Sequence, residues 1–322
     1  MRPLQGSATR RKLLRLLGAG ALGARFSILD ATEFRAPPGP DARSPADAAF
    51  ARRFDDFFFD QYWRRNTDQA VAVGYYRVAD ILNVPDARYR ADYLRFLEHW
   101  LAQLGTEPWA GLSDHGRANW TVLESQLRYE RWALTIFREW QWNPALYNVA
   151  DPFALLLGTD YAPLEQRLRS VLRRLQAVPA YYGAALQALR QPTPEHRTLA
   201  IEQNRGALEV FGDGLKRQLA DSRLEPLERA SALERIGAAR AAIESYIAAL
   251  EGLGAGGERT FRIGKLLYEQ KFQYVQQSGE SAQSLFDRAV HEQQQVLARM
   301  DELAVRLWAQ YLPGAPVPVP TP

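Results

Sequence analysis

The feature that most limits the possible folds is the spacing of large apolar side chains, which follows the α-helical period over most of the chain. Between residues 89 and 104, successive members are separated by four, three, one, three, one and three positions: Tyr89, Tyr93, Phe96, Leu97, Trp100, Leu101 and Leu104. This spacing places all of them on one face of a helix. Alternating apolar and polar runs, which mark half-buried strands, are nearly absent. The sequence therefore predicts an all-α fold built as a multi-helix array.

Helix boundaries follow from capping residues, prolines and glycines. A first helix is expected from Ser44, and a second from Pro85-Asp86. The further helices are expected at about 114–140, 162–176, 179–189, 193–219, 224–253, 260–272 and 282–312. In the last helix, the period predicts one buried face: Leu285, Ala289, Val296, Met300, Leu303 and Leu307.

Length and composition indicate a folded protein with restricted chemistry. The chain has 322 residues, 47% of them hydrophobic, which suffices for a sizeable core. The 40 Lys and Arg residues are mixed with 37 Asp and Glu residues, and no basic run is interleaved with stacking aromatics, so nucleic acid is not an expected partner. Cysteine is absent and only four histidines occur, which excludes disulfides and thiolate metal sites.

The two ends differ from the region between them. Residues 1–43 resemble an export signal and linker, because Arg10-Arg11-Lys12 precedes a short Leu/Gly/Ala run as in twin-arginine signals. The alternative is a short amphipathic helix or tail on a cytoplasmic protein. No stretch reaches the ~18 apolar residues of a transmembrane helix. Residues 44–312 are predicted to form the helical domain, and residues 313–322 a proline-rich, disordered tail.

The densest group of large rings lies at 131–160, where a predicted helix breaks at Asn143-Pro144. Polar and aromatic side chains alternate there, so this corner is either a buried connection between helices or one wall of a binding cleft. The candidate cleft residues are Trp140, Trp142, Asn143, Tyr147 and Asn148.

A second candidate group crowds both charge signs onto one short helix beside a glycine-rich hinge at 252–257. Its members are Arg262, Lys265, Tyr268, Glu269 and Lys271. The alternative is an ordinary solvated helix face.

No catalytic residue or metal ligand is predicted. A helical zinc site needs a second histidine four positions after the first, but His291-Glu292 is followed by Gln295 at that position. The pentapeptide G-x-S-x-G of serine hydrolases does not occur. The glycines at 252–257 follow a predicted helix, whereas a dinucleotide-binding loop follows a strand.

Three long blocks, at 127–182, 192–215 and 259–289, resemble in their order the N-terminal half of the DUF885 family of bacterial proteins. The resemblance extends over about 50–314. It implies a mostly helical, usually exported protein related to zinc-dependent, peptidase-like hydrolases. In that family the presumed zinc motif, a histidine-glutamate helix with a second histidine, lies in the C-terminal half.

The resemblance therefore brings the fold but no metal ligand or catalytic residue to this chain, and zinc is expected only in full-length relatives. The leading hypothesis is a truncated, non-catalytic N-terminal half that is not active alone and exposes apolar surface or self-associates. A second is a split enzyme completed by a separately encoded C-terminal half. A third is a non-enzymatic binding or scaffold protein that uses the aromatic corner.

Overall fold

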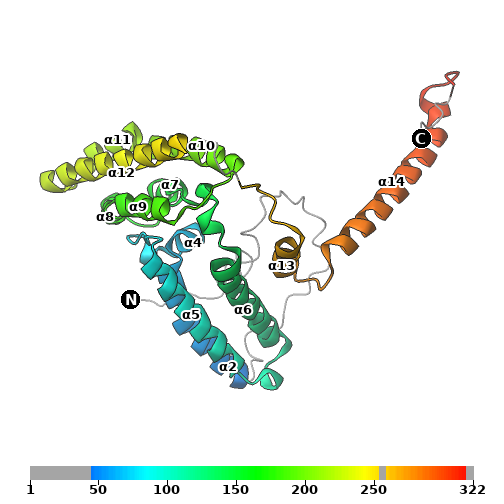
Figure 1. Ribbon diagram of the computed structural model, residues 1–322, viewed down its shortest axis with the longest axis horizontal. Helices are drawn as coiled ribbons and strands as arrows, with labels where there is room; N and C mark the ends of the chain where they lie inside the picture. The colour runs from blue at the N-terminus through cyan, green and yellow to red at the C-terminus, as the bar shows by residue number, and fades with distance from the viewer. Residues whose placement is uncertain (1–44, 254–258, 317–322) are drawn as a thin grey trace. The chain divides into compact units, whose positions relative to one another are not determined.

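The computed structural model describes residues 45–253 and 259–316, and within these ranges all regular secondary structure is helical. The predicted all-α, multi-helix array is confirmed (Figure 1). The export-signal-like segment, Ser44, most of the glycine-rich hinge and the last six tail residues lie outside the described residues. The chain divides into two compact units, 1–262 and 263–322.

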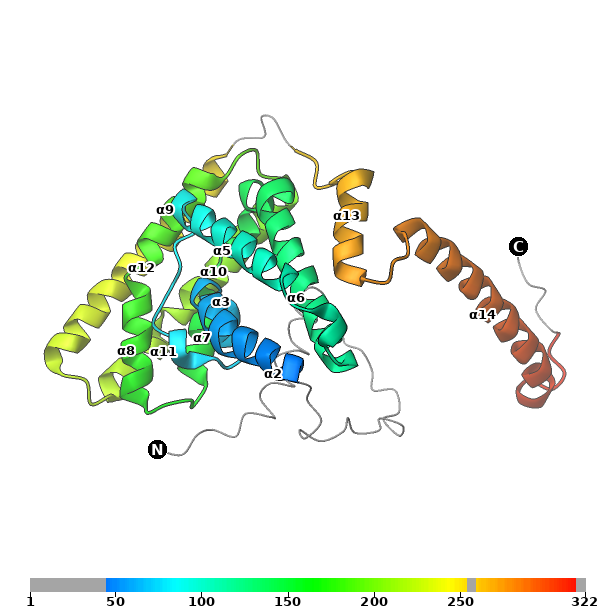
Figure 2. The ribbon, with the colours of Figure 1, turned by 90° about the horizontal axis from the view of Figure 1, so that it is seen from below.

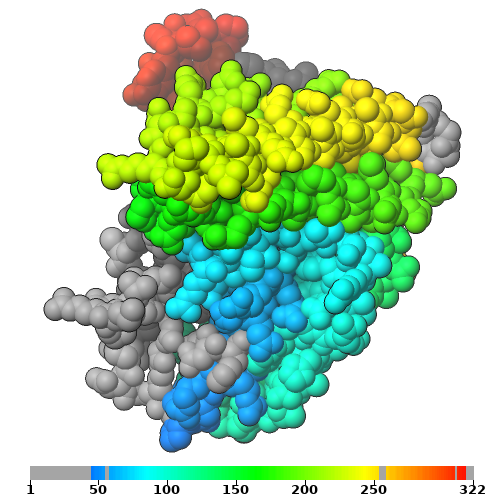
Figure 3. Space-filling view, turned by 90° about the vertical axis from the view of Figure 1, so that its left-hand side faces the viewer, coloured from blue at the N-terminus to red at the C-terminus, as the bar shows by residue number. Residues whose placement is uncertain are grey.

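The helices of the first unit form two layers with α4 between them (Figures 1 and 3). Figure 2 looks onto the first layer from below. The first layer contains α2 (Pro45–Ala51), the π-helical turn η2 (Arg52–Phe58), α3 (Phe59–Arg65), α5 (Ala87–Gly105), η4 (Trp109–Gly111) and α6 (Asp114–Trp132). Between the layers lie α4 (Thr67–Ala72) and η3 (Tyr76–Val78). The second layer contains α7 (Ala150–Gly158), α8 (Leu164–Leu175), α9 (Val178–Ala188), α10 (Pro194–Val210), α11 (Asp213–Asp221) and α12 (Pro226–Gly252).

Aromatic packing fills the core of the first layer. Phe58 of η2 stacks on Phe96 of α5 at 5.8 Å between ring centroids and meets Trp100 edge-on at 5.2 Å. All three rings are buried. The stripe predicted over residues 89–104 therefore faces this core, and α5 begins one residue after Asp86, whose carboxylate accepts a hydrogen bond from the Tyr89 backbone N–H.

The second layer has its own core, in which Phe153 of α7 meets Phe211 at 5.0 Å. The layers are tied by Arg174 of α8, whose side chain is fully buried. Its guanidinium donates to the backbone oxygen of Ile81 and pairs with Asp68 of α4. A buried charge is tolerated only with such partners.

Three predicted boundaries are wrong. The helix expected at 114–140 ends at Phe137, before the break predicted at Asn143-Pro144, because Arg138 is left-handed. The helix expected at 193–219 is interrupted after Val210, because the chain turns at Phe211 and is extended at Gly212 before α11 begins. A Cβ at Gly212 would lie 3.0 Å from the Glu209 oxygen, so glycine permits this tight turn. The helix expected at 260–272 begins later, at Lys265, and ends at Gln276 as α13.

The second unit contains α13 (Lys265–Gln276) and α14 (Ala282–Tyr311). The face of α14 that was predicted to be buried is not covered within the second unit: Met300 is 58% exposed and Leu307 45%. The spacing correctly gave an amphipathic helix, but spacing does not show whether a partner is present. None of the helices in the described ranges has the length and hydropathy needed to cross a membrane.

Candidate functional site

The aromatic corner is built by a change of helical geometry at the end of α6. Residues Ala133–Phe137 form a π-helical turn, η5, in which the Arg138 N–H bonds the Ala133 oxygen at 2.9 Å. Arg138 then adopts a left-handed conformation, with φ of 47°. Two short 3-10 turns, Glu139–Gln141 (η6) and Pro144–Leu146 (η7), complete the corner before α7.

Three of the five predicted corner residues are buried in the first unit. Trp142 lies edge-on to His196 of α10, at 5.5 Å, and the Arg259 guanidinium lies 4.7 Å from its ring centroid. The Asn143 amide donates to Glu139, and the Tyr147 hydroxyl donates to the Trp140 backbone oxygen at 2.6 Å. These contacts pair the polar groups that the corner buries.

The buried residues therefore hold the corner in place. Burial raises the pKa of Tyr147 to about 12, so its phenol stays protonated at neutral pH. The fourth predicted residue, Asn148, accepts a hydrogen bond from the Ala150 N–H at the start of α7. None of these four side chains lines either described pocket of the first unit.

The fifth residue, Trp140, lines an open pocket of about 350 Å³. Its indole N–H donates to the Leu134 oxygen at 3.1 Å, which fixes the ring. The Arg90 guanidinium of α5 lies 4.0 Å from the ring centroid, within the range of a cation–π contact. The other principal lining residues are Ala91, Leu94, Leu134 and Arg138. Arg90, Leu94 and Arg138 were not identified from the sequence as candidate pocket residues.

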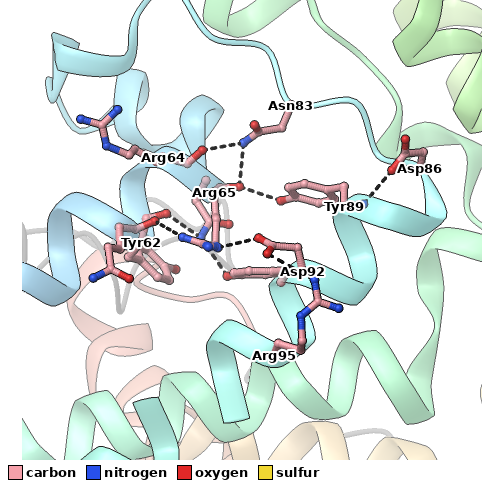
Figure 4. Close-up of polar contacts among 11 residues, drawn as sticks. Tyr62, Arg64, Arg65, Asn83, Asp86, Tyr89, Asp92 and Arg95 are labelled. Carbon is pink, nitrogen blue, oxygen red and sulfur yellow. Dashed lines mark hydrogen bonds and ion pairs between the residues drawn. The ribbon is translucent and has the colours of Figure 1, made fainter. Parts of the chain in front are cut away.

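The position of Arg90 depends on how α5 begins. Figure 4 shows the polar contacts that join the end of α3 to this helix. The Tyr89 hydroxyl donates to the Arg65 oxygen at 2.6 Å, and the Arg65 side chain pairs with Asp92 at 3.0 Å. Asn83 donates to the same Arg65 oxygen. The first turns of α5 are thereby fixed on both sides of Arg90.

A carboxylate is enclosed between α3, α5 and α6. Glu130 accepts hydrogen bonds from Tyr62 and Gln126, each at 2.6 Å, and from Tyr93. Burial raises the pKa of Glu130, while the three donors oppose this effect. Glu130 lines neither pocket, and we assign it a structural role.

A second open pocket, of about 330 Å³, lies further along the groove between α5 and α6. Its lining carries both charge signs, with Glu98 and Glu124 beside Arg128 and Arg131. Arg128 and Glu124 form an ion pair at 2.8 Å. This pocket therefore has no strong preference for one sign of ligand charge.

The second predicted group is divided between the two units. Arg262 belongs to the first unit, whereas Lys265, Tyr268, Glu269 and Lys271 lie on α13 of the second. Glu269 accepts a hydrogen bond from the backbone N–H of Ala282 at the start of α14. Tyr268 stacks on Phe272 of the same helix. These contacts join α13 and α14.

The histidines do not form a zinc site. His99, His115, His196 and His291 lie on α5, α6, α10 and α14, respectively. Among the residues that the structure describes, no three His, Asp or Glu side chains converge on a common point. His291 contacts Gln295, the residue that replaces the second histidine of the zinc pattern. The donor set in 45–253 and 259–316 thus does not fit the zinc that is expected in full-length relatives.

These features define an all-α protein with a packed two-layer unit, a pocket at its aromatic corner and an uncovered amphipathic helix. Residues 68–315 match the family described as a bacterial protein of unknown function, DUF885, and the chain belongs to this family.

A solved structure from Shewanella oneidensis, described as "a putative lipoprotein of unknown function", is similar to this chain. The TM-score is 0.79 and the sequence identity 37%, over 84% of this chain. The match covers 50% of the Shewanella chain, so the present chain spans about half the length of that relative. No match was found among curated proteins.

Proposed function

We propose that this chain forms the non-catalytic, N-terminal helical half of a peptidase-like hydrolase, and that the other half of the fold docks on α14 and supplies the zinc. The resemblance in the sequence gives the reaction class. The match covers half of the Shewanella relative, and the unmatched half of that protein is the candidate for the docking segment.

The uncovered face of α14 is the observation that carries this proposal. Phe286, Val296, Met300, Leu303 and Leu307 are each between 36% and 63% exposed. At 100° per residue, the large apolar side chains from Leu285 to Trp308, apart from Val305, fall within about 140° of the helix surface. This is wider than the seam of a two-stranded coiled coil. The surface that covers α14 must therefore contact it from more than one side, as in a helical bundle.

The test is co-expression of this chain with the part of the Shewanella relative that it does not span. The expected result is a one-to-one complex that retains zinc and hydrolyses peptides, while this chain alone neither retains zinc nor hydrolyses them. Met300→Arg should abolish the complex, because it places a charge in the apolar face. Ala298→Arg is the matched control, since Ala298 lies about 160° round the helix from Met300.

A complex that survives Met300→Arg, or failure to form one, would contradict docking on α14. Dimers of this chain alone that Met300→Arg dissociates, with no binding of the other part, would instead establish self-association.

Export is part of the same proposal. It is supported by the twin-arginine-like residues Arg10-Arg11 and by the description of the Shewanella protein as a lipoprotein. Residues 1–43 fused to a reporter should direct it out of the cytoplasm only in cells with an active twin-arginine pathway. An Arg10→Lys, Arg11→Lys variant should keep the reporter inside. A reporter that stays inside in every strain would contradict export.

A further inference from the structure

The pocket at Trp140 combines an apolar floor with positive charge at its rim. Leu94 of α5, Leu134 of η5 and Trp140 provide the apolar surface. Arg90 and Arg138 provide two guanidinium groups, and none of the side chains lining the pocket is acidic. The pocket is thus complementary to a ligand with an apolar body and one negatively charged end.

Arg90 is held at the pocket by its own contacts. One of its nitrogens donates to the Pro85 oxygen, and its guanidinium carbon lies over the Trp140 ring. Burial lowers the pKa of Arg90, which means that its charge lacks part of the stabilisation it would have in water. An anion in the pocket would restore that stabilisation.

Arg138 occupies a backbone conformation that usually favours glycine. A non-glycine residue at φ of 47° is sterically disfavoured, and strained backbone residues cluster at functional sites. The Nε atom of Arg138 donates to the Thr135 oxygen at 2.7 Å. Within 45–253 and 259–316 no hydrogen-bond or ion-pair partner is found for its terminal nitrogens, and the residue is exposed. Two donors are thus available to bind a planar anion side by side.

We propose that this pocket binds the carboxylate of an apolar organic acid of about dipeptide size, with Arg90 and Arg138 on the carboxylate and Leu94, Leu134 and Trp140 around the apolar group. Arginine matches the two oxygens of a carboxylate, and the volume suits a small ligand. The proposal concerns the first unit alone and holds whether or not a second half docks on α14.

Calorimetric titration of the purified chain with three probes tests this proposal. N-acetyl-alanyl-leucine carries a free carboxylate, its carboxamide carries none, and hexanoate carries the carboxylate on an acyl chain. Both acids should bind. The carboxamide should bind at least about tenfold more weakly than the peptide acid, because it cannot form charge-assisted hydrogen bonds with the two arginines. Tighter binding of the peptide acid identifies a peptide end as the ligand, and tighter binding of hexanoate identifies an acyl chain.

Variants separate binding from folding. Arg138→Gly should weaken the binding of the peptide acid at least about tenfold, because the guanidinium is lost. The unfolding midpoint should be unchanged or higher, because glycine adopts this φ without strain. Arg90→Gln should also weaken it. Arg88→Gln is the matched control on the same helix, since Arg88 is exposed and does not line the pocket. Equal binding of acid and carboxamide, binding of neither acid, or unchanged affinity in Arg138→Gly would overturn the proposal.

Discussion

The two units differ in how their apolar side chains are used. In the first unit, Phe153, Phe211 and Tyr246 are completely buried, and polar groups such as those of the aromatic corner find partners inside the unit. In the second unit, α14 has no buried side chain among its described residues, although its apolar period is as regular as that of α5. The comparison shows that a regular apolar period identifies the face of a helix that can be buried. Whether that face is buried depends on a second element that packs against it.

The largest expected effect is a difference between two phenylalanine substitutions. Phe153→Ala should lower the free energy of unfolding by about 3–5 kcal/mol, because it leaves a cavity in the second layer of the first unit. Phe286→Ala in α14 should change it by less than about 0.5 kcal/mol, since Phe286 is 63% exposed. Urea unfolding followed by circular dichroism measures both. Comparable losses would show that α14 is packed in the free chain.

A smaller effect is expected in the pH dependence of stability. Because burial raises the pKa of Glu130 above 4.5, the folded chain binds this proton more tightly than the unfolded chain. The contribution of Glu130 to the free energy of unfolding is therefore largest below pH 4.5, where its carboxyl group is protonated. This contribution is lost as the pH rises from there through the raised pKa. A pKa difference of one between the folded and unfolded chains corresponds to about 1.4 kcal/mol of stability.

Glu130→Gln should remove this pH dependence, because an amide does not ionise. Unfolding measured at intervals from pH 4 to 8 should give a flatter curve for the variant than for the unmodified chain. Glu302→Gln on α14 serves as the control, since the Glu302 side chain is 66% exposed and should not alter the curve. Parallel curves for Glu130→Gln and the unmodified chain would contradict the expectation.

The smallest expected effect concerns one hydrogen bond. The Tyr246 hydroxyl of α12 donates to the Pro144 oxygen of the aromatic corner at 2.9 Å. Tyr246→Phe should lower the free energy of unfolding by about 1 kcal/mol, because the buried oxygen loses its donor. Tyr311→Phe in α14 should have no measurable effect, as Tyr311 is 72% exposed. A neutral Tyr246→Phe would mean that the Pro144 oxygen finds another partner.

Much of the fold could be predicted from the sequence because the local signals agree. Asp86 caps α5 and the apolar period continues to Leu104, so both the start and the buried face were clear. The turn at Phe211 and Gly212 was not found, since the apolar period continues across it and only tertiary packing favours the break. Glycine alone in a helical pattern is a weak signal.

The candidate site was predictable only in part. The cluster of rings drew attention to Trp140, but the neighbouring residues Trp142 and Tyr147 turned out to be buried, and no local pattern distinguishes the two situations. Arg90 and Leu94 lie at the edge of the buried stripe of α5, next to Leu101, and the helical spacing does not show that this edge lines a pocket. The left-handed conformation of Arg138 has no signal in the sequence, because arginine has no preference for it.

The π-helical turn at Ala133–Phe137 has a consequence for how this corner could change. A turn closed between residues five apart holds about one residue more than an α-helical turn, which rotates the downstream chain by about 100°. Removing a single residue between 133 and 137 would keep every ring of the corner and redirect all of them together. Insertions and deletions at this point are therefore expected to change the direction in which Trp140 projects. Family members with the same residues at this corner are then expected to differ in the orientation of this ring.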